Sequence, residues 1–114
     1  MTTTFTTNAI VLAAIDGTKT GLTTDEIDTI INMNEGFITA LFKIESDFTF
    51  SASNAKHLIL RKMVTAMTCI DVVAASMSWN ALGEIEALLD KFVMEYQECL
   101  KFMEKQDLMK FLGE

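Results

Sequence analysis

The sequence contains no proline and only two cysteines among its 114 residues. Because proline interrupts helices, its absence favours a mostly helical chain. The cysteines, Cys69 and Cys99, lie in separate apolar segments with helical periodicity, where an unpaired cysteine behaves as a small hydrophobic residue. We therefore expect no disulfide framework, and a reducing compartment as the setting of the protein.

Basic residues are also scarce, since nine Lys and Arg stand against 16 Asp and Glu, which gives a net charge of −7. No cluster of Lys or Arg stands out along the chain. Proteins that grip a nucleic-acid backbone neutralise its phosphates with basic side chains, so direct binding of this kind is disfavoured. A protein of this charge that works near DNA is expected to surround it rather than hold it.

Long hydrophobic runs are absent. The most apolar stretch, residues 63–77, is about 15 residues long and is interrupted by Thr65, Thr68 and Asp71, so it is too short and too polar to span a bilayer. The opening residues, MTTTFTTN, have neither a basic region nor an apolar one. We expect no signal peptide, no membrane association and a soluble protein.

The motifs of common catalytic and cofactor sites are missing: there is no GxSxG, no HExxH, no phosphate-binding glycine loop and no calcium loop. His57 is the only histidine, and we interpret it as a surface or interface residue rather than a catalyst or zinc ligand. Asp28, Asn32 and Glu35 share a helical face, which could suit a hard cation, but a solvated face is the better interpretation. We expect no enzyme activity, no metal site and no cofactor.

Half of the residues are hydrophobic, which is enough for a single domain over residues 1–114 to bury a core. We predict a mainly α fold, a small helical bundle around one long central helix. That helix is expected over Asn54–Met77, and its 24 residues would measure about 36 Å. Its apolar faces should be core, with Met67 and Ile70 nearly inaccessible. Its polar residues, spaced by three and four, form one stripe that can meet water or a polar neighbour: His57, Arg61, Thr65, Thr68 and Asp71.

The N-terminal part is predicted to hold an extended arm and a short helix. Residues 1–7 are rich in threonine and are expected to form the arm. The apolar segment NAIVLAAI, residues 8–15, can form a short buried helix capped by Thr7 or Asn8.

A second helix is predicted to begin at Thr24, because Thr23 and Glu26 have the spacing of a capping box. The apolar residues that follow recur on one helical face: Ile27, Ile30, Ile31, Ile38, Leu41 and Phe42. The residues expected on the opposite face are Asp25, Asp28, Asn32, Glu35 and Thr39. This helix should pack against the long one.

The remainder of the chain is predicted to be a short extended segment, the long helix and one more helix. Residues 43–53 include DFTF, which suits a brief extended piece or half of a hairpin, and Ser51 or Ser53 should cap the long helix. The last helix should begin between Ala81 and Glu84 and be strongly amphipathic. Its apolar face is expected to comprise Ile85, Leu88, Leu89, Phe92, Tyr96, Cys99, Leu100 and Met103.

An apolar tail follows this helix. Such a segment either folds back onto its own core or docks on a partner, and we predict a partner-docking role for residues 107–114. The residues concerned are Asp107, Leu108, Met109, Lys110, Phe111, Leu112, Gly113 and Glu114.

The order of these segments resembles the small head–tail adaptor, or connector, proteins of tailed bacteriophages. The resemblance lies in the arm, the short helix, LTTDEIDTIINMNEGFITALFK, the loop with DFTFS, HLILRKMVTAMTCIDVVAAS and a last amphipathic helix with a tail. The resemblance covers most of the chain. It lies in the order and residue composition of the segments rather than in a diagnostic motif.

The resemblance implies a viral structural protein located in the virion neck and made in the host cytoplasm. Copies would form a ring, commonly of twelve, beneath the portal protein and beside other neck or tail-completion proteins, and DNA would pass through without specific binding. The family's portal-binding role falls on residues 107–114 here. The alternative is a small cytoplasmic helical interaction or regulatory module that dimerises through the long helix.

Overall fold

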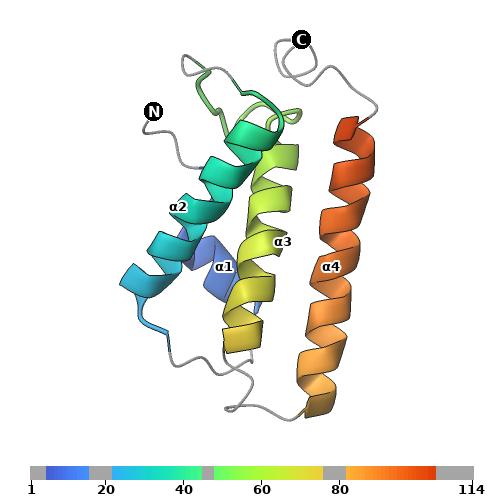
Figure 1. Cartoon of the computed structure of the whole chain (residues 1–114). Coiled ribbons are helices and arrows are strands. Elements are labelled where there is room, and N and C mark those ends of the chain that lie inside the picture. Colours follow the sequence, from blue (N-terminus) through green and yellow to red (C-terminus); the bar gives the residue numbers. More distant parts are fainter. Residues whose placement is uncertain (1–4, 16–21, 45–47, 76–81, 105–114) are drawn as a thin grey trace.

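The computed structural model describes residues 5–15, 22–44, 48–75 and 82–104. The predicted mainly α fold is confirmed, because these residues form four helices and no strand: α1 (Asn8–Ala14), α2 (Thr24–Leu41), α3 (Leu58–Ala75) and α4 (Leu82–Glu104). Figure 1 shows α3 between α2 and α4, with α1 behind them, and α3 packs against each of the other three helices.

The starts of the first two helices agree with the capping signals in the sequence. Thr7 is the N-cap of α1, and its Oγ1 accepts the Ile10 amide at 3.3 Å. At α2 the capping box is complete: Thr23 Oγ1 accepts the Glu26 amide at 3.2 Å, and Glu26 Oε1 accepts the Thr23 amide at 2.9 Å. Both predicted starts are therefore confirmed, as is the start of α4 at Leu82.

The prediction of one long central helix over Asn54–Met77 is wrong in its length. Helix α3 has 18 described residues, the same as α2, whereas α4 has 23. The first four predicted residues form turns instead, because Asn54 Oδ1 accepts the Lys56 amide and His57 Nδ1 accepts the Ser51 amide, both at 3.0 Å. Such bonds between side chain and backbone compete with a helical start.

The connection between α2 and α3 also differs from the prediction. Lys43 adopts a positive φ of 54° just after α2, and the described parts of the connection, 43–44 and 48–53, contain no strand. Neither Ser51 nor Ser53 caps α3, which begins at Leu58; their hydroxyls lie 2.9 Å apart and bond each other. The segment SWNALG after Met77, whose composition predicts a turn, lies outside the described residues up to Ala81.

Two clusters of buried side chains hold the helices together. One joins the C-terminal parts of α2 and α4 to the first half of α3, and the other joins α1 and the opposite ends of these helices. Burying a large aliphatic side chain contributes roughly 1.5–3 kcal/mol, so these clusters are the main source of stability. The predicted inner face of α4 is confirmed, with Ile85, Phe92, Cys99 and Met103 buried.

The prediction that Met67 and Ile70 are nearly inaccessible is wrong, because both are only half-buried. They line a shallow hollow between α2 and α4, together with Asn34, Asp71 and Tyr96. The fully buried positions of α3 lie on its other faces and include Leu60. Among the described residues, none of the helices is both long enough and apolar enough to cross a membrane.

Candidate interaction surface

Residues Phe5–Thr7 are here called the N-terminal strap. The first two of them lie in the interior of the fold, whereas Thr7, the N-cap of α1, is exposed. The side chains of Phe5 and Thr6 are fully buried. The carboxylate of Glu35, on α2, accepts the backbone N–H of Phe5 and, at 3.3 Å, that of Thr6. The described part of the expected arm is therefore fixed to the core by its main chain.

Glu35 contradicts the prediction of a solvated face with Asp28 and Asn32, because only 7% of it is exposed. Burial raises the pKa of Glu35, and the two backbone N–H bonds oppose that rise by favouring the ionised form. Asp28 is exposed and accepts a hydrogen bond from the Asn8 side chain at 2.9 Å. Within the described residues no group of three His, Cys, Asp or Glu side chains could hold a metal ion.

Arg61, on α3, holds the same strap from the other side. Its Nε donates to the Phe5 carbonyl at 2.9 Å, and its guanidinium lies 5.2 Å from the centre of the Phe50 ring. The rings of Phe48 and Phe50 contact both Phe5 and His57. His57 is therefore a buried residue, 7% exposed, so the surface alternative in its interpretation as a surface or interface residue is wrong.

The polar stripe of α3 contacts polar side chains of other segments. The sequence had left open whether this stripe meets water or a polar neighbour. Thr65 Oγ1 lies 2.7 Å from Thr6 Oγ1, so the stripe contacts the strap. Asn34 Nδ2 donates to Thr68 Oγ1 at 3.1 Å and to Asp71 Oδ2 at 3.2 Å, so the stripe also contacts α2. These bonds fix how the strap and α2 lie on α3.

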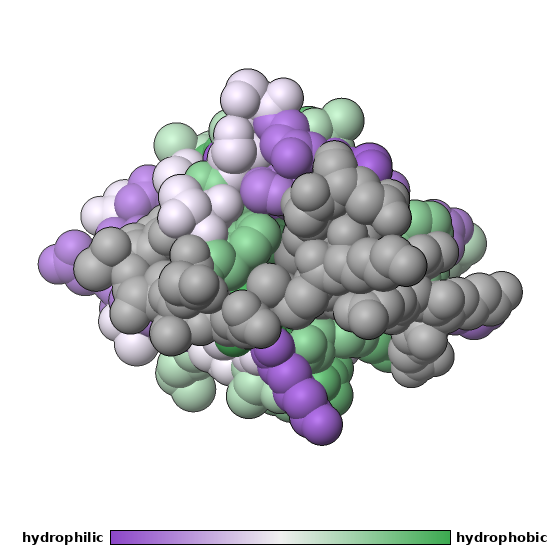
Figure 2. All heavy atoms as spheres, turned by 90° about the horizontal axis from the view of Figure 1, so that it is seen from above, coloured by the Kyte–Doolittle hydropathy of each residue, from purple (hydrophilic) through white to green (hydrophobic). Residues whose placement is uncertain are grey.

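Large apolar side chains on the outer side of α2 form a surface that we call the α2 ridge: Met33, Phe37 and Leu41. They are 70%, 51% and 48% exposed, so the prediction that Leu41 belongs to the buried face is wrong. Figure 2 views the molecule from the end where α2 and α4 terminate, and hydrophobic residues reach the surface at several of its edges. Exposed apolar groups at a spacing of four residues form a continuous strip along a helix.

A second surface feature, here called the basic cleft, is a hollow of about 440 Å³ between α1, α3 and α4. Its apolar walls come from Ile10, Ala14 and Phe92. Three cations also line it, Arg61, Lys62 and Lys91, against one carboxylate, that of Glu95, and Leu58 and Thr65 complete the lining. A group of three cations is unexpected in a chain with a net charge of −7. It was not predicted, because Lys91 comes from a different helix than Arg61 and Lys62.

The thiols do not form a reactive site. Burial raises the pKa of the Cys69 thiol to about 12 and also raises that of Cys99. Because the thiolate is the nucleophile, both thiols have low reactivity in the folded protein. The two cysteines are unpaired, as predicted.

The predicted partner-docking residues, 107–114, lie outside the described residues. The ridge and the cleft were not predicted. Once the buried face of α2 is known, however, the four-residue spacing of Met33 and Phe37 places both residues on the outer side of the helix. Comparisons of the chain with protein families, with curated proteins and with solved structures find no match.

Proposed function

We propose that this protein is a structural subunit of a virion, a head–tail adaptor that forms part of a ring beneath the portal in the neck of a tailed phage. The order of its segments and their residue composition, given above, support the assignment to this class. The structural observation that carries the proposal is the α2 ridge, whose most exposed side chain, Met33, is 70% exposed. An apolar strip of this kind is typical of a subunit that packs against other chains.

The charge of the chain supports the same proposal. With a net charge of −7, the protein does not attract a polyanion, which suits the wall of a channel through which DNA must slide. In this role the protein acts by assembly rather than by catalysis, and DNA passes it without specific contacts.

The alternative is a regulatory module that dimerises through the helix now described as α3. That route is less favoured, because the apolar residues of α3, among them Leu60, Met63 and Val64, are buried against other helices of the same chain. A dimer through α3 would have to open this core.

The proposal is tested by mixing the purified chain with the portal ring of the same phage and separating the products by size. We expect copurification of the full chain with the ring. A chain shortened after Gln106 should remain folded by circular dichroism but lose portal binding, because residues 107–114 carry the proposed attachment.

Two outcomes would contradict parts of this proposal. If the full chain does not bind the portal, the adaptor function is wrong. If the shortened chain binds normally, the attachment lies elsewhere, and if the shortened chain unfolds, the tail belongs to the intramolecular core.

A further inference from the structure

The α2 ridge contains a glycine that the fold itself does not require. Gly36 lies between Met33 and Phe37 in the middle of α2 and is exposed. Apart from its chain neighbours and the nearby backbone of its own helix, no atom lies within 4 Å of the position that a Cβ would take. Glycine weakens a helix relative to alanine, and here it relieves no crowding within the described chain. A small residue flanked by large apolar ones lets a second chain approach the helix backbone closely.

The basic cleft indicates what kind of surface it would accept. Its apolar walls suit hydrophobic side chains, and its cations suit carboxylates beside them. Lys62 and Lys91 are exposed, and neither has an ion-pair partner among the described residues. The complement of the cleft is therefore an apolar strip with acidic residues at one end.

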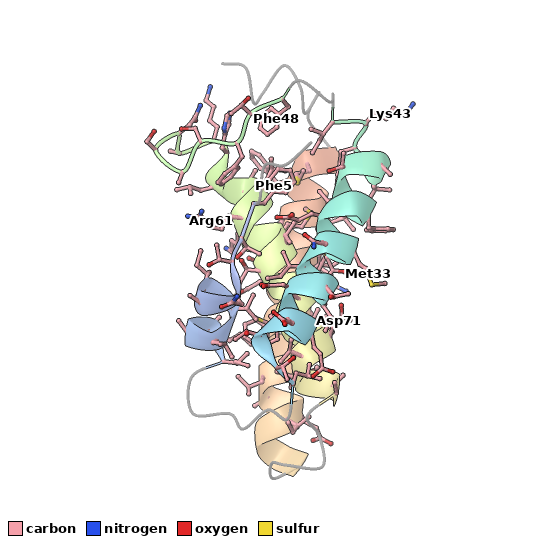
Figure 3. The ribbon with its side chains drawn as sticks, turned by 90° about the vertical axis from the view of Figure 1, so that its left-hand side faces the viewer. Phe5, Met33, Lys43, Phe48, Arg61 and Asp71 are labelled. Carbon is pink, nitrogen blue, oxygen red and sulfur yellow. The ribbon has the colours of Figure 1, made fainter. Side chains whose placement is uncertain are left out.

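The α2 ridge has this composition. Its apolar strip is preceded on the same helix by the acidic first turn, which contains Asp25 and Glu26. Figure 3 shows Met33 and Arg61 directed to opposite sides of the molecule, so the ridge and the cleft are on different faces. One copy therefore cannot place its own ridge in its own cleft.

We propose that the α2 ridge of one copy docks in the basic cleft of the next copy. Because the two surfaces differ and lie on opposite faces, the contact is head-to-tail. One subunit of such a pair keeps its cleft free and the other keeps its ridge free, so further copies can add at both ends. Repetition of such a contact produces a ring when the rotation closes. The ring role rests on the proposed function, whereas the contact itself can be tested with the protein alone.

The experiment uses two interface variants of the full chain and a control for each. Met33→Lys places a cation against the cationic cleft, and its control is Met94→Lys, a change at a 60% exposed position on the outer side of α4. The double variant Lys62→Glu with Lys91→Glu reverses the cleft, and its control is Lys101→Glu on the same helix as Lys91. Circular dichroism and thermal melting confirm that each variant is folded, and Phe37→Ser serves as a second ridge variant.

Self-association is measured by analytical ultracentrifugation up to about 1 mM, where even weak contacts populate complexes. We expect the wild-type chain and both controls to associate, and each interface variant to associate at least about tenfold more weakly. We expect a mixture of the ridge variant and the cleft variant to stop at one-to-one dimers, since only one intact ridge and one intact cleft remain. Raising the salt concentration should weaken the wild-type contact.

Three outcomes would overturn the inference. The first is a wild-type chain that stays monomeric over the whole range. The second is a cleft variant that associates normally while the ridge variant does not, because that pattern belongs to a symmetric contact between two ridges. The third is a mixture that gives no heterodimer. Portal binding is measured separately, so a failed contact with intact portal binding leaves the adaptor function standing, and the reverse result leaves the contact standing.

Discussion

Glu35 and Arg61 bind opposite ends of one residue: the Glu35 carboxylate accepts the N–H of Phe5, and the Arg61 Nε donates to the carbonyl of Phe5. One charge comes from α2 and the other from α3, and the Phe5 side chain between them is fully buried. The strap is thus fixed through its main chain, and the two charges that fix it give measurable consequences.

Glu35→Gln should change how stability depends on pH. Burial raises the pKa of Glu35 above its ordinary value of 4.5, so the folded protein binds the proton more tightly than the unfolded chain does. The Glu35 contribution therefore increases stability as pH falls from neutral through the raised pKa, and levels off below about 4.5. In urea unfolding at several pH values, the variant should lack this component.

A second variant at the same position separates charge from hydrogen bonding. Glu35→Leu leaves the buried amides of Phe5 and Thr6 without an acceptor, which should cost about 1–3 kcal/mol for each amide. Glu35→Gln keeps an acceptor and should be much less harmful. Identical pH profiles for Glu35→Gln and wild type would show that Glu35 does not titrate differently in the folded state.

The contact between Thr6 and Thr65 should behave as a coupled pair. Their hydroxyl oxygens are 2.7 Å apart, and Thr6 is fully buried. Thr6→Val or Thr65→Val alone should destabilise by about 1–2 kcal/mol, because one hydroxyl loses its partner. The double variant should cost less than the two single costs combined, and simple additivity in denaturant unfolding would rule out the bond.

The two faces of α3 should respond differently to truncation. Leu60 is fully buried, so Leu60→Ala should cost about 2–5 kcal/mol through lost burial and a cavity. Ile70 is half-buried beside a surface hollow that water can fill, so Ile70→Ala should cost about 1–2 kcal/mol. Equal losses would mean that the hollow is closed in solution.

Thr23→Ala should destabilise the protein by about 1 kcal/mol, since the Glu26 amide loses its capping oxygen. Thr24→Ala, one residue later at an exposed helical position, should have little effect and serves as the control. If both variants melt at the same temperature, the capping box does not contribute in solution.

Cys69 should resist thiol reagents in the native state. Its side chain is fully buried and its pKa is raised to about 12, so little thiolate forms at pH 8. The labelling rate should rise with urea in parallel with unfolding. Rapid labelling of Cys69 without denaturant would show that the contact of α3 with α1 opens easily.

The sequence predicted those parts of the fold that depend on local chemistry. The capping box at Thr23, the N-cap at Thr7 and the inner face of α4 depend on residues a few positions apart, and all three are confirmed. Helical periodicity also identified a polar stripe on α3, although not the neighbours of that stripe.

The rest depended on contacts between distant segments. Glu35 is a charged residue, which sequence reasoning places on a solvent-facing surface. Its burial becomes favourable only because Phe5 approaches and donates its backbone N–H. His57 follows the helical pattern of α3, but its bond to the Ser51 amide draws it into a turn. The basic cleft combines side chains from α3 and α4, so no window of sequence contains it.

The strap also has a consequence for the order of folding. Its partners lie 30, 56 and 59 residues further along the chain, on α2 and α3. During synthesis the strap emerges before all of these partners, and the last of them becomes accessible only when Thr65 has left the ribosome. Each closure of so long a loop costs entropy. The strap is therefore among the last segments to be fully fixed, although it precedes its partners in the chain. Protection of the Phe5 amide from hydrogen exchange would report the docking of the strap.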